Sequence, residues 1–172
     1  FLSKQALATL YKSHVRSTLE YCCPIWMGSG SEALFLLDRI QARAAALLGH
    51  HARDLQSLQH RRGVAALSLM HRIVHNAAPV ALSHLCPQRA TTVRRSLRRI
   101  NSHRAAQNFF CPPERKILTP KFWLRSFIPL CTEAWNDLPP SLQSEPNPAT
   151  FKHLLNRSSL PLCLQNLHVH PV

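Results

Sequence analysis

The chain has 172 residues, of which 45% are hydrophobic, so it can bury a substantial core and does not have the composition of a disordered protein. Its 21 lysine and arginine residues against eight acidic residues give a formal net charge of +13, which favours polyanionic partners such as nucleic acid. No apolar run approaches the roughly 20 residues that span a bilayer, so we expect no membrane partner. The sequence starts at Phe1 without a secretion leader, which indicates a piece of a longer intracellular protein of the nucleus or cytoplasm.

Residues 1–85 are expected to form a small antiparallel array of helices. Ser3 is placed to cap the first helix, which Pro24 should end at Cys23, because a residue before proline disfavours helical geometry. Cys22 is expected to face the core, with Tyr21 and Trp26 on either side of the corner. The expected inner stripe of this helix is Leu7, Leu10, Tyr11, His14, Thr18, Leu19 and Cys22.

A second helix is predicted with Ser31 as its N-terminal cap and Gly49 as its C-terminal cap. Its expected inner stripe is Leu34, Leu37, Ile40, Ala44 and Leu47. A third element should open at Asp54, with Leu55 and Leu58 inward and Arg61 and Arg62 outward, and the helical pattern continues beyond Gly63.

Residues 86–116 form a basic connector between this region and the C-terminal one. The connector contains eight cationic residues and a single acid, Glu114, and its weak apolar periodicity predicts an extended or weakly helical segment. The cationic residues are Arg89, Arg94, Arg95, Arg98, Arg99, Arg104, Arg115 and Lys116.

Residues 117–172 are rich in proline and aromatic residues, which predicts an irregular module of short elements. We expect one short strand at "RSFIP", a short helix at "LCTEAWNDL", and a helix capped by Asn147 with Phe151, Leu154 and Leu155 on one face. Trp123, Phe127 and Trp135 are assigned to the core, and the tail after Leu160 is expected to fray. The predicted fold class is therefore mainly α.

No pattern of catalytic or metal-ligating residues is complete. The six cysteines include no CxxC pair and are expected to be free thiols, and the acids are scattered. His71 and His75 stand four residues apart, but "HRIVH" lacks the zinc-protease glutamate and a third ligand, so both are interpreted as surface or half-buried helix residues. We expect no catalysis, no metal and no cofactor in this chain.

The best candidate for a functional site is the basic stretch "RRSLRR" at 94–99, which would form one cationic face if helical. Arginine binds phosphate bidentately and stacks on bases; the alternative is a solvated linker that binds nothing specifically. The predicted nucleic-acid contacts are Arg61, Arg62, Arg94, Arg95, Arg98, Arg99 and Arg104.

Four segments in order carry a resemblance to a known family: "LATLYKSHVRSTLEYCCPIW", "LLDRIQARAAALLG", "LQSLQHRRGVAALSLMHRIVHN" and "RSFIPLCTEAWNDLPPSLQSEPNPATFKHLL". Together they resemble the thumb and post-thumb region that follows the polymerase core in reverse transcriptases of jockey-like and related LINE-type non-LTR retrotransposons. The resemblance covers about residues 7–155.

This resemblance implies an accessory region that contacts RNA or an RNA–DNA template–primer duplex and supports the polymerase core. The palm aspartates, with two divalent ions expected to be magnesium, would lie upstream, because the aromatic-x-Asp-Asp motif is absent here. Two alternatives stay open: a decayed remnant without function, or a recruited structural or protein-interaction module.

Overall fold

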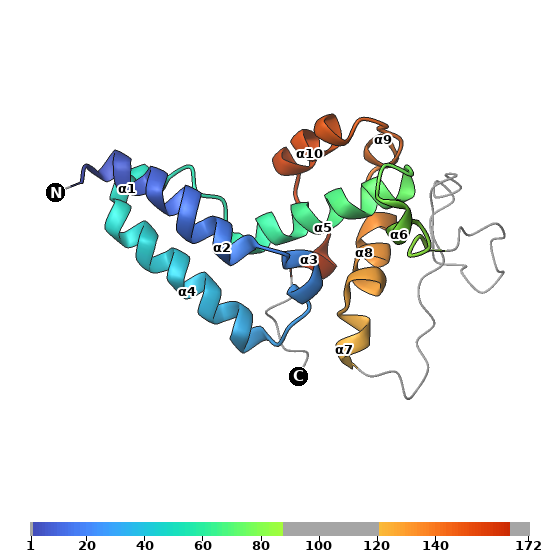
Figure 1. Ribbon diagram of the computed structural model, residues 1–172, viewed down its shortest axis with the longest axis horizontal. Coiled ribbons are helices and arrows are strands. Elements are labelled where there is room, and N and C mark those ends of the chain that lie inside the picture. The colour runs from blue at the N-terminus through green and yellow to red at the C-terminus, as the bar shows by residue number, and fades with distance from the viewer. Residues whose placement is uncertain (1, 88–120, 166–172) are drawn as a thin grey trace.

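Helices are the one kind of regular element that the computed structural model contains in the residues it describes, 2–87 and 121–165. The mainly α fold class is confirmed. An N-terminal helical hairpin extends from a second group of helices arranged around the long helix α5 (Leu58–Val74) (Figure 1). None of the helices in these two ranges has the length and apolarity needed to cross a bilayer.

The first arm of the hairpin is an almost continuous helical run of α1 (Lys4–Leu10), the π-helical turn η1 (Tyr11–Val15) and α2 (Arg16–Glu20), and the second arm is α4 (Ser31–Leu48). Ser3 caps the run as predicted, because its hydroxyl accepts a hydrogen bond from the amide of Ala6 at 3.2 Å. A small core lies between the arms, where the Tyr11 hydroxyl donates to Gln41 Oε1 at 3.1 Å. It comprises Ala8, Tyr11 and Leu48, with Leu7, Ala44, Ala52 and Leu55 packed against them.

The inner stripe predicted for the first helix is only partly correct. Tyr11 is buried, but Leu10, His14 and Thr18 are exposed. The π-helical turn accounts for Thr18, because one extra residue in a turn rotates every following side chain by about 100° around the axis, but Leu10 lies before that turn.

The corner between the two arms also differs from its prediction. The first arm ends at Glu20, and Cys22 takes a left-handed conformation with φ 51°. Cys23 then begins the short helix α3 (Cys23–Trp26), where Pro24 is tolerated in the first turn because no intrahelical partner is needed there.

This change of direction reverses the roles of the two cysteines. Cys22 is exposed and Cys23 is buried, so the prediction of an inward Cys22 is wrong. Trp26 packs against the main core and donates its indole N–H to the carbonyl of Tyr21 at 2.8 Å, whereas the Tyr21 side chain is 76% exposed. Of the two aromatic residues expected beside the corner, only Trp26 packs there.

α4 ends at Gly49 as predicted, but Ser31 is its first residue rather than its cap, since the N-cap position is Gly30 and no side chain caps this end. Gly49 terminates it with φ +60°, a conformation that glycine adopts without a steric penalty. Its inward face contains Leu34 and Leu48, while Ile40 and Leu47, both predicted inward, are exposed. The first arm and α5 cover only one side of α4, so these two apolar residues face solvent.

α5 is a single helix at the centre of the molecule. It begins at Leu58 rather than near Asp54, because the Ser57 hydroxyl accepts a hydrogen bond from the amide of His60 at 3.1 Å. Between the arm and α5 lies the short 3₁₀ turn η2 (Gly49–Ala52), and α6 (Val80–Ser83) follows α5. Leu58 is buried and Leu55 packs in the small core, as predicted.

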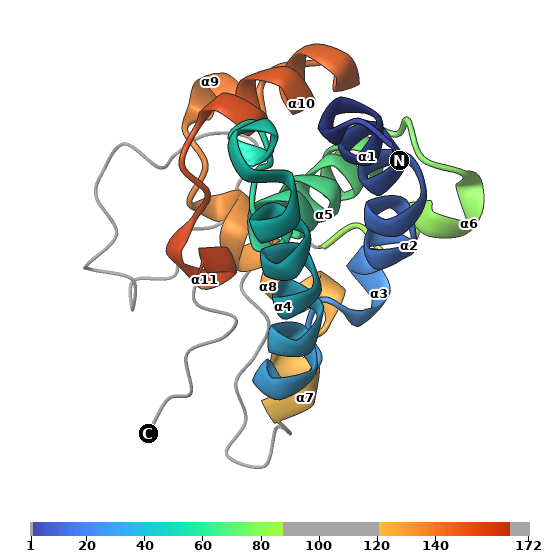
Figure 2. The same ribbon diagram turned by 90° about the vertical axis from the view of Figure 1, so that its left-hand side faces the viewer.

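The described C-terminal residues form five helices. They are α7 (Lys121–Leu124), α8 (Phe127–Asn136), α9 (Pro140–Gln143), α10 (Pro148–Arg157) and α11 (Leu162–Gln165). Of these, α8, α10 and α11 pack on α5, while α7 contacts α8 and α9 contacts α10 (Figures 1 and 2). The helix predicted within "LCTEAWNDL" is confirmed as part of α8. Asn147 caps α10 as predicted, because its Oδ1 accepts from the amides of Ala149 and Thr150 at 2.8 and 3.3 Å.

Four predictions for this part are wrong. The strand predicted at "RSFIP" is instead the start of α8. Pro129 lies in its first turn, where backbone N–H groups have no acceptor within the helix, so the missing N–H of proline costs no hydrogen bond. Trp123 and Leu154 are exposed, although Trp135 is fully buried and Phe127 packs against the core. The fraying predicted after Leu160 is wrong for residues 162–165, which form α11 with Leu164 buried in the main core, and residues 166–172 lie outside the described part of the chain.

The main core joins residues from the predicted 1–85 and 117–172 regions. Met27, Leu34, Leu67 and Met70 pack in one cluster with Trp135 and with the members from α10 and α11, Phe151, Leu155 and Leu164. The backbone comes close as well, because a Cβ added to Gly28 would lie 1.9 Å from the carbonyl oxygen of Arg125. The two sequence regions therefore contribute to one packed body.

Candidate nucleic-acid interface

Arg62 was predicted to point outward and contact nucleic acid, but it is a core residue, 1% exposed. Its guanidinium binds the carboxylate of Asp38 on α4, with Nη1 and Nη2 each 3.1 Å from Oδ1. Arg62 lies on the side of α5 that faces α4, and a guanidinium in that position requires a carboxylate to compensate its charge. The outward prediction is wrong, and this guanidinium is not accessible to a phosphate.

Arg61 is half-buried, with about a third of its side chain exposed at 32%, rather than fully outward. Its Nη2 donates to Glu20 Oε2 at 2.8 Å, and its Nε donates to Oε1 of the same carboxylate, which joins α5 to α2. The hydrogen bonds that Arg61 donates to Glu20 are the main reason that the pKa of Arg61 is raised. Arg16 adds a second cation beside Glu20, at 3.7 Å. A phosphate at Arg61 would therefore compete with a carboxylate that is already in place.

The other five predicted contacts, Arg94, Arg95, Arg98, Arg99 and Arg104, lie outside the described residues. The residues on either side of that segment belong to the folded body. Cys86 packs against the main core, and Arg125 donates from Nη2 to the carbonyl of Ser29 at 3.1 Å. The basic segment is therefore attached to the same body at both of its ends.

Exposed cations also lie on the body itself, on residues that the sequence patterns did not single out. They are Lys4, Lys12, Arg39, Arg43, Arg53, Arg72, Lys152 and Arg157. They come from different elements, and Lys4 donates from Nζ to the carbonyl of Leu47, at the end of α4. Because these side chains are exposed, they are available to an anion. No regular spacing in the sequence indicates which cations are exposed.

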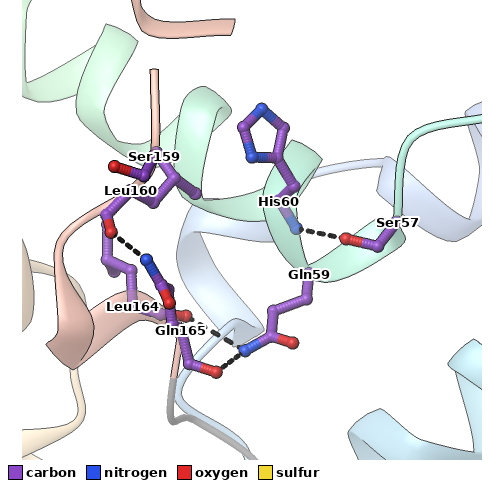
Figure 3. A pocket seen from close by; sticks show the side chains of 7 residues that line it. All are labelled: Ser57, Gln59, His60, Ser159, Leu160, Leu164 and Gln165. Carbon is purple, nitrogen blue, oxygen red and sulfur yellow. Dashed lines mark hydrogen bonds between the residues drawn. The ribbon is translucent and has the colours of Figure 1, made fainter. Parts of the chain in front are cut away.

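A pocket of about 340 Å³ opens where the N-terminal turn of α5 meets the last described residues (Figure 3). Its lining residues are Ser57, Gln59, His60, Ser159, Leu160, Leu164 and Gln165. Gln59 donates from Nε2 to the carbonyls of Leu164, at 3.3 Å, and Gln165, and Gln165 donates to Leu160. The amide groups thus hold the C-terminal segment against α5, and the lining contains neither an acid nor a Lys or Arg that would bind a charged ligand.

His71 and His75 do lie on one face of α5, with ring centroids 4.3 Å apart. Each ring uses its Nε2–H to donate to a backbone carbonyl, His71 to Glu145 at 2.6 Å and His75 to Gln143 at 3.2 Å. Burial is the main cause that lowers the pKa of His71. The two imidazoles therefore attach the α9–α10 connection to α5. Within residues 2–87 and 121–165, no group of three or more His, Cys, Asp or Glu side chains could hold a metal ion.

The described cysteines are free thiols, as predicted: Cys22, Cys23, Cys86, Cys131 and Cys163. Burial raises the pKa of Cys23 to about 11 and that of Cys163 to about 12. A thiol with a pKa this high is almost entirely protonated at neutral pH and is a poor nucleophile. These two positions therefore fit structural roles.

Comparisons with protein-family models, curated proteins and solved structures gave no match to this chain.

Proposed function

We propose that this chain is the accessory nucleic-acid-binding region of a non-LTR retrotransposon reverse transcriptase, without catalysis of its own. It would bind RNA or an RNA–DNA template–primer duplex beside the polymerase core, inside the cell. That core would supply the aspartates and the two divalent ions. The order of the four sequence segments supports the family, and the distribution of charge supports the binding role.

The distribution of charge is the observation that carries the proposal. Residues 88–120 contain eight of the 21 Lys and Arg residues of the chain and one of its eight acids. By contrast, the two adjacent arginines of α5 are already neutralised by Glu20 and Asp38. Because each phosphate contact releases condensed counterions, an unbalanced cationic segment next to a stable helical body favours a nucleic-acid duplex.

The salt dependence of binding tests the proposal. Fluorescence anisotropy with a labelled RNA–DNA hybrid duplex should show the dissociation constant rising steeply between about 50 and 200 mM salt. Replacing Arg95, Arg98 and Arg99 with alanine should reduce the slope of log K against log salt by roughly 2 to 3.

A triple replacement of Arg53, Arg72 and Arg157 by alanine removes the same charge from exposed positions of the body and is the matched control. We expect it to reduce the slope less. An affinity that does not change with salt would rule out phosphate contact. An intact polymerase palm encoded upstream in the same transcript would distinguish an accessory region from a decayed remnant.

A further inference from the structure

α4 has apolar residues on two opposite sides, and only one side is covered. Leu34 and Leu48 face the interior, whereas Leu36, Ile40 and Leu47 are 57, 42 and 70% exposed. A helix that is apolar on both sides is normally buried on both. α4 contacts α1, η2 and α5, and the hairpin that it forms extends away from the other helices (Figure 1).

The exposed residues have the spacing of a helix–helix contact. Positions 36, 40, 43 and 47 follow steps of four, three and four residues, which is the a/d spacing of a coiled coil. They fall within about 60° of one another around the helix axis. The third position is Arg43, and Arg39 lies next to it on the exposed surface. We call Leu36, Ile40, Arg43 and Leu47 the outer seam of α4.

The charge of the outer seam is not balanced within residues 2–87 and 121–165. No acid there forms an ion pair with Arg39 or Arg43, and the nearest carboxylate along α4, that of Asp38, binds Arg62. A helix packed on the seam would bury part of the Arg43 guanidinium, which is costly unless a carboxylate lies opposite it.

We propose that the outer seam of α4 binds an amphipathic helix of a partner protein that carries apolar residues at the same spacing and a glutamate or aspartate facing Arg43. A second copy of this chain does not fit, because its own seam offers an arginine in place of the acid and each copy carries a net charge of +13. A single polar residue within such a seam selects the partner and its register. This inference does not rest on the proposed function.

Designed helical peptides test the proposal against the full chain. Each peptide has four positions with the same spacing as the outer seam, three of them leucine and one glutamate. The glutamate is the second position in the peptide designed to pack antiparallel to α4 and the third in the peptide designed to pack parallel, so that it lies opposite Arg43 in each case. The matched peptides carry lysine in place of that glutamate. Fluorescence anisotropy should show one glutamate peptide binding at least about tenfold more tightly than its lysine counterpart.

Variants of the exposed seam residues identify the surface. Ile40→Asp should abolish binding, because it places a carboxylate in the apolar part of the seam. The Arg43→Glu variant should no longer bind the glutamate peptide and should bind the lysine peptide instead. The Arg95, Arg98 and Arg99 triple alanine variant should bind the glutamate peptide unchanged, which separates the seam from the basic segment. Circular dichroism should confirm that each variant is folded.

Four results would overturn the proposal. The first is equal binding of the glutamate and lysine peptides, and the second is binding that survives both Ile40→Asp and Arg43→Glu. The third is sedimentation showing a dimer of the chain that Ile40→Asp dissolves, since the seam would then pair with a second copy. Absence of binding by every peptide also contradicts it.

Discussion

The guanidinium of Arg62 is enclosed within the helical body and bound to the carboxylate of Asp38, which connects α5 to α4. Asp38 is 32% exposed, but removing it is still expensive because the buried guanidinium of Arg62 then loses the carboxylate that compensates its charge. We expect Asp38→Ala to lower the free energy of unfolding by about 3 kcal/mol. Urea denaturation measures the change.

Glu32 lies on the same helix, is exposed, and provides the control for the loss of one carboxylate. Glu32→Ala should lower the free energy of unfolding by about 0.5 kcal/mol or less, because it removes only the favourable interaction of an exposed carboxylate with the N-terminus of the helix. Equal effects of the two substitutions would contradict a special role for the Arg62–Asp38 pair.

Gly28 and Gly30 give a second matched pair. A Cβ at Gly28 would lie 1.9 Å from the backbone carbonyl oxygen of Arg125, whereas a Cβ at Gly30 would meet nothing within 4 Å. Because a backbone cannot move aside as a side chain can, Gly28→Ala should destabilise the protein by roughly 2 kcal/mol or more. Gly30 is the N-cap of α4, a position where alanine is less favourable than glycine, so Gly30→Ala should cost about 1 kcal/mol and less than Gly28→Ala. Thermal denaturation that ranks them in the opposite order would refute the close contact between the α3–α4 and α7–α8 connections.

Acidification should destabilise the fold through His71. Burial lowers the pKa of this imidazole below its value of 6.5 in the unfolded chain, so the unfolded state binds more protons as the pH falls. The contribution of His71 is therefore complete above pH 6.5 and is lost progressively as the pH falls from there towards the folded-state pKa. Urea denaturation at a series of pH values from 7.5 to about 5 should show the decline.

His71→Gln keeps a side-chain donor for the carbonyl of Glu145 and removes the titration, so it should flatten the pH dependence. The same replacement at His153, an exposed residue of α10, should leave the pH dependence of the parent. If both variants keep the decline, the pH effect does not come from His71.

The two adjacent cysteines should differ in reactivity. Cys22 is exposed, while Cys23 is buried and has its pKa raised to about 11, so its thiolate is scarce and shielded at neutral pH. Alkylation with iodoacetamide under native conditions, followed by peptide mass spectrometry, should modify Cys22 first and Cys23 only on unfolding. Modification of both at one rate in the folded protein would show that the corner between the hairpin arms is open.

The local features of this fold follow from short stretches of sequence. Ser3, Gly49 and Asn147 were all predicted as caps, and each makes its cap by interactions within a few residues. The position of α4 and the burial of Trp135 and Phe151 were predicted for a similar reason, since a long apolar period or a large aromatic residue leaves few alternatives. The free thiols of the described cysteines were predicted from the absence of a CxxC pair.

The sequence by itself determined that the protein is a basic, mainly helical chain with caps at known places and most of its unbalanced charge in one segment. Only the tertiary structure decided which sides of those helices are covered. Arg62 turned inward because Asp38, 24 residues earlier, lies opposite it, and Leu164 is buried because α11 returns to α5. Ile40 and Leu47 stayed exposed because nothing in the described chain packs on that side of α4. A periodic pattern indicates that a helix has an apolar side. Which element packs on that side depends on residues far away in the chain, and a short sequence window does not contain them.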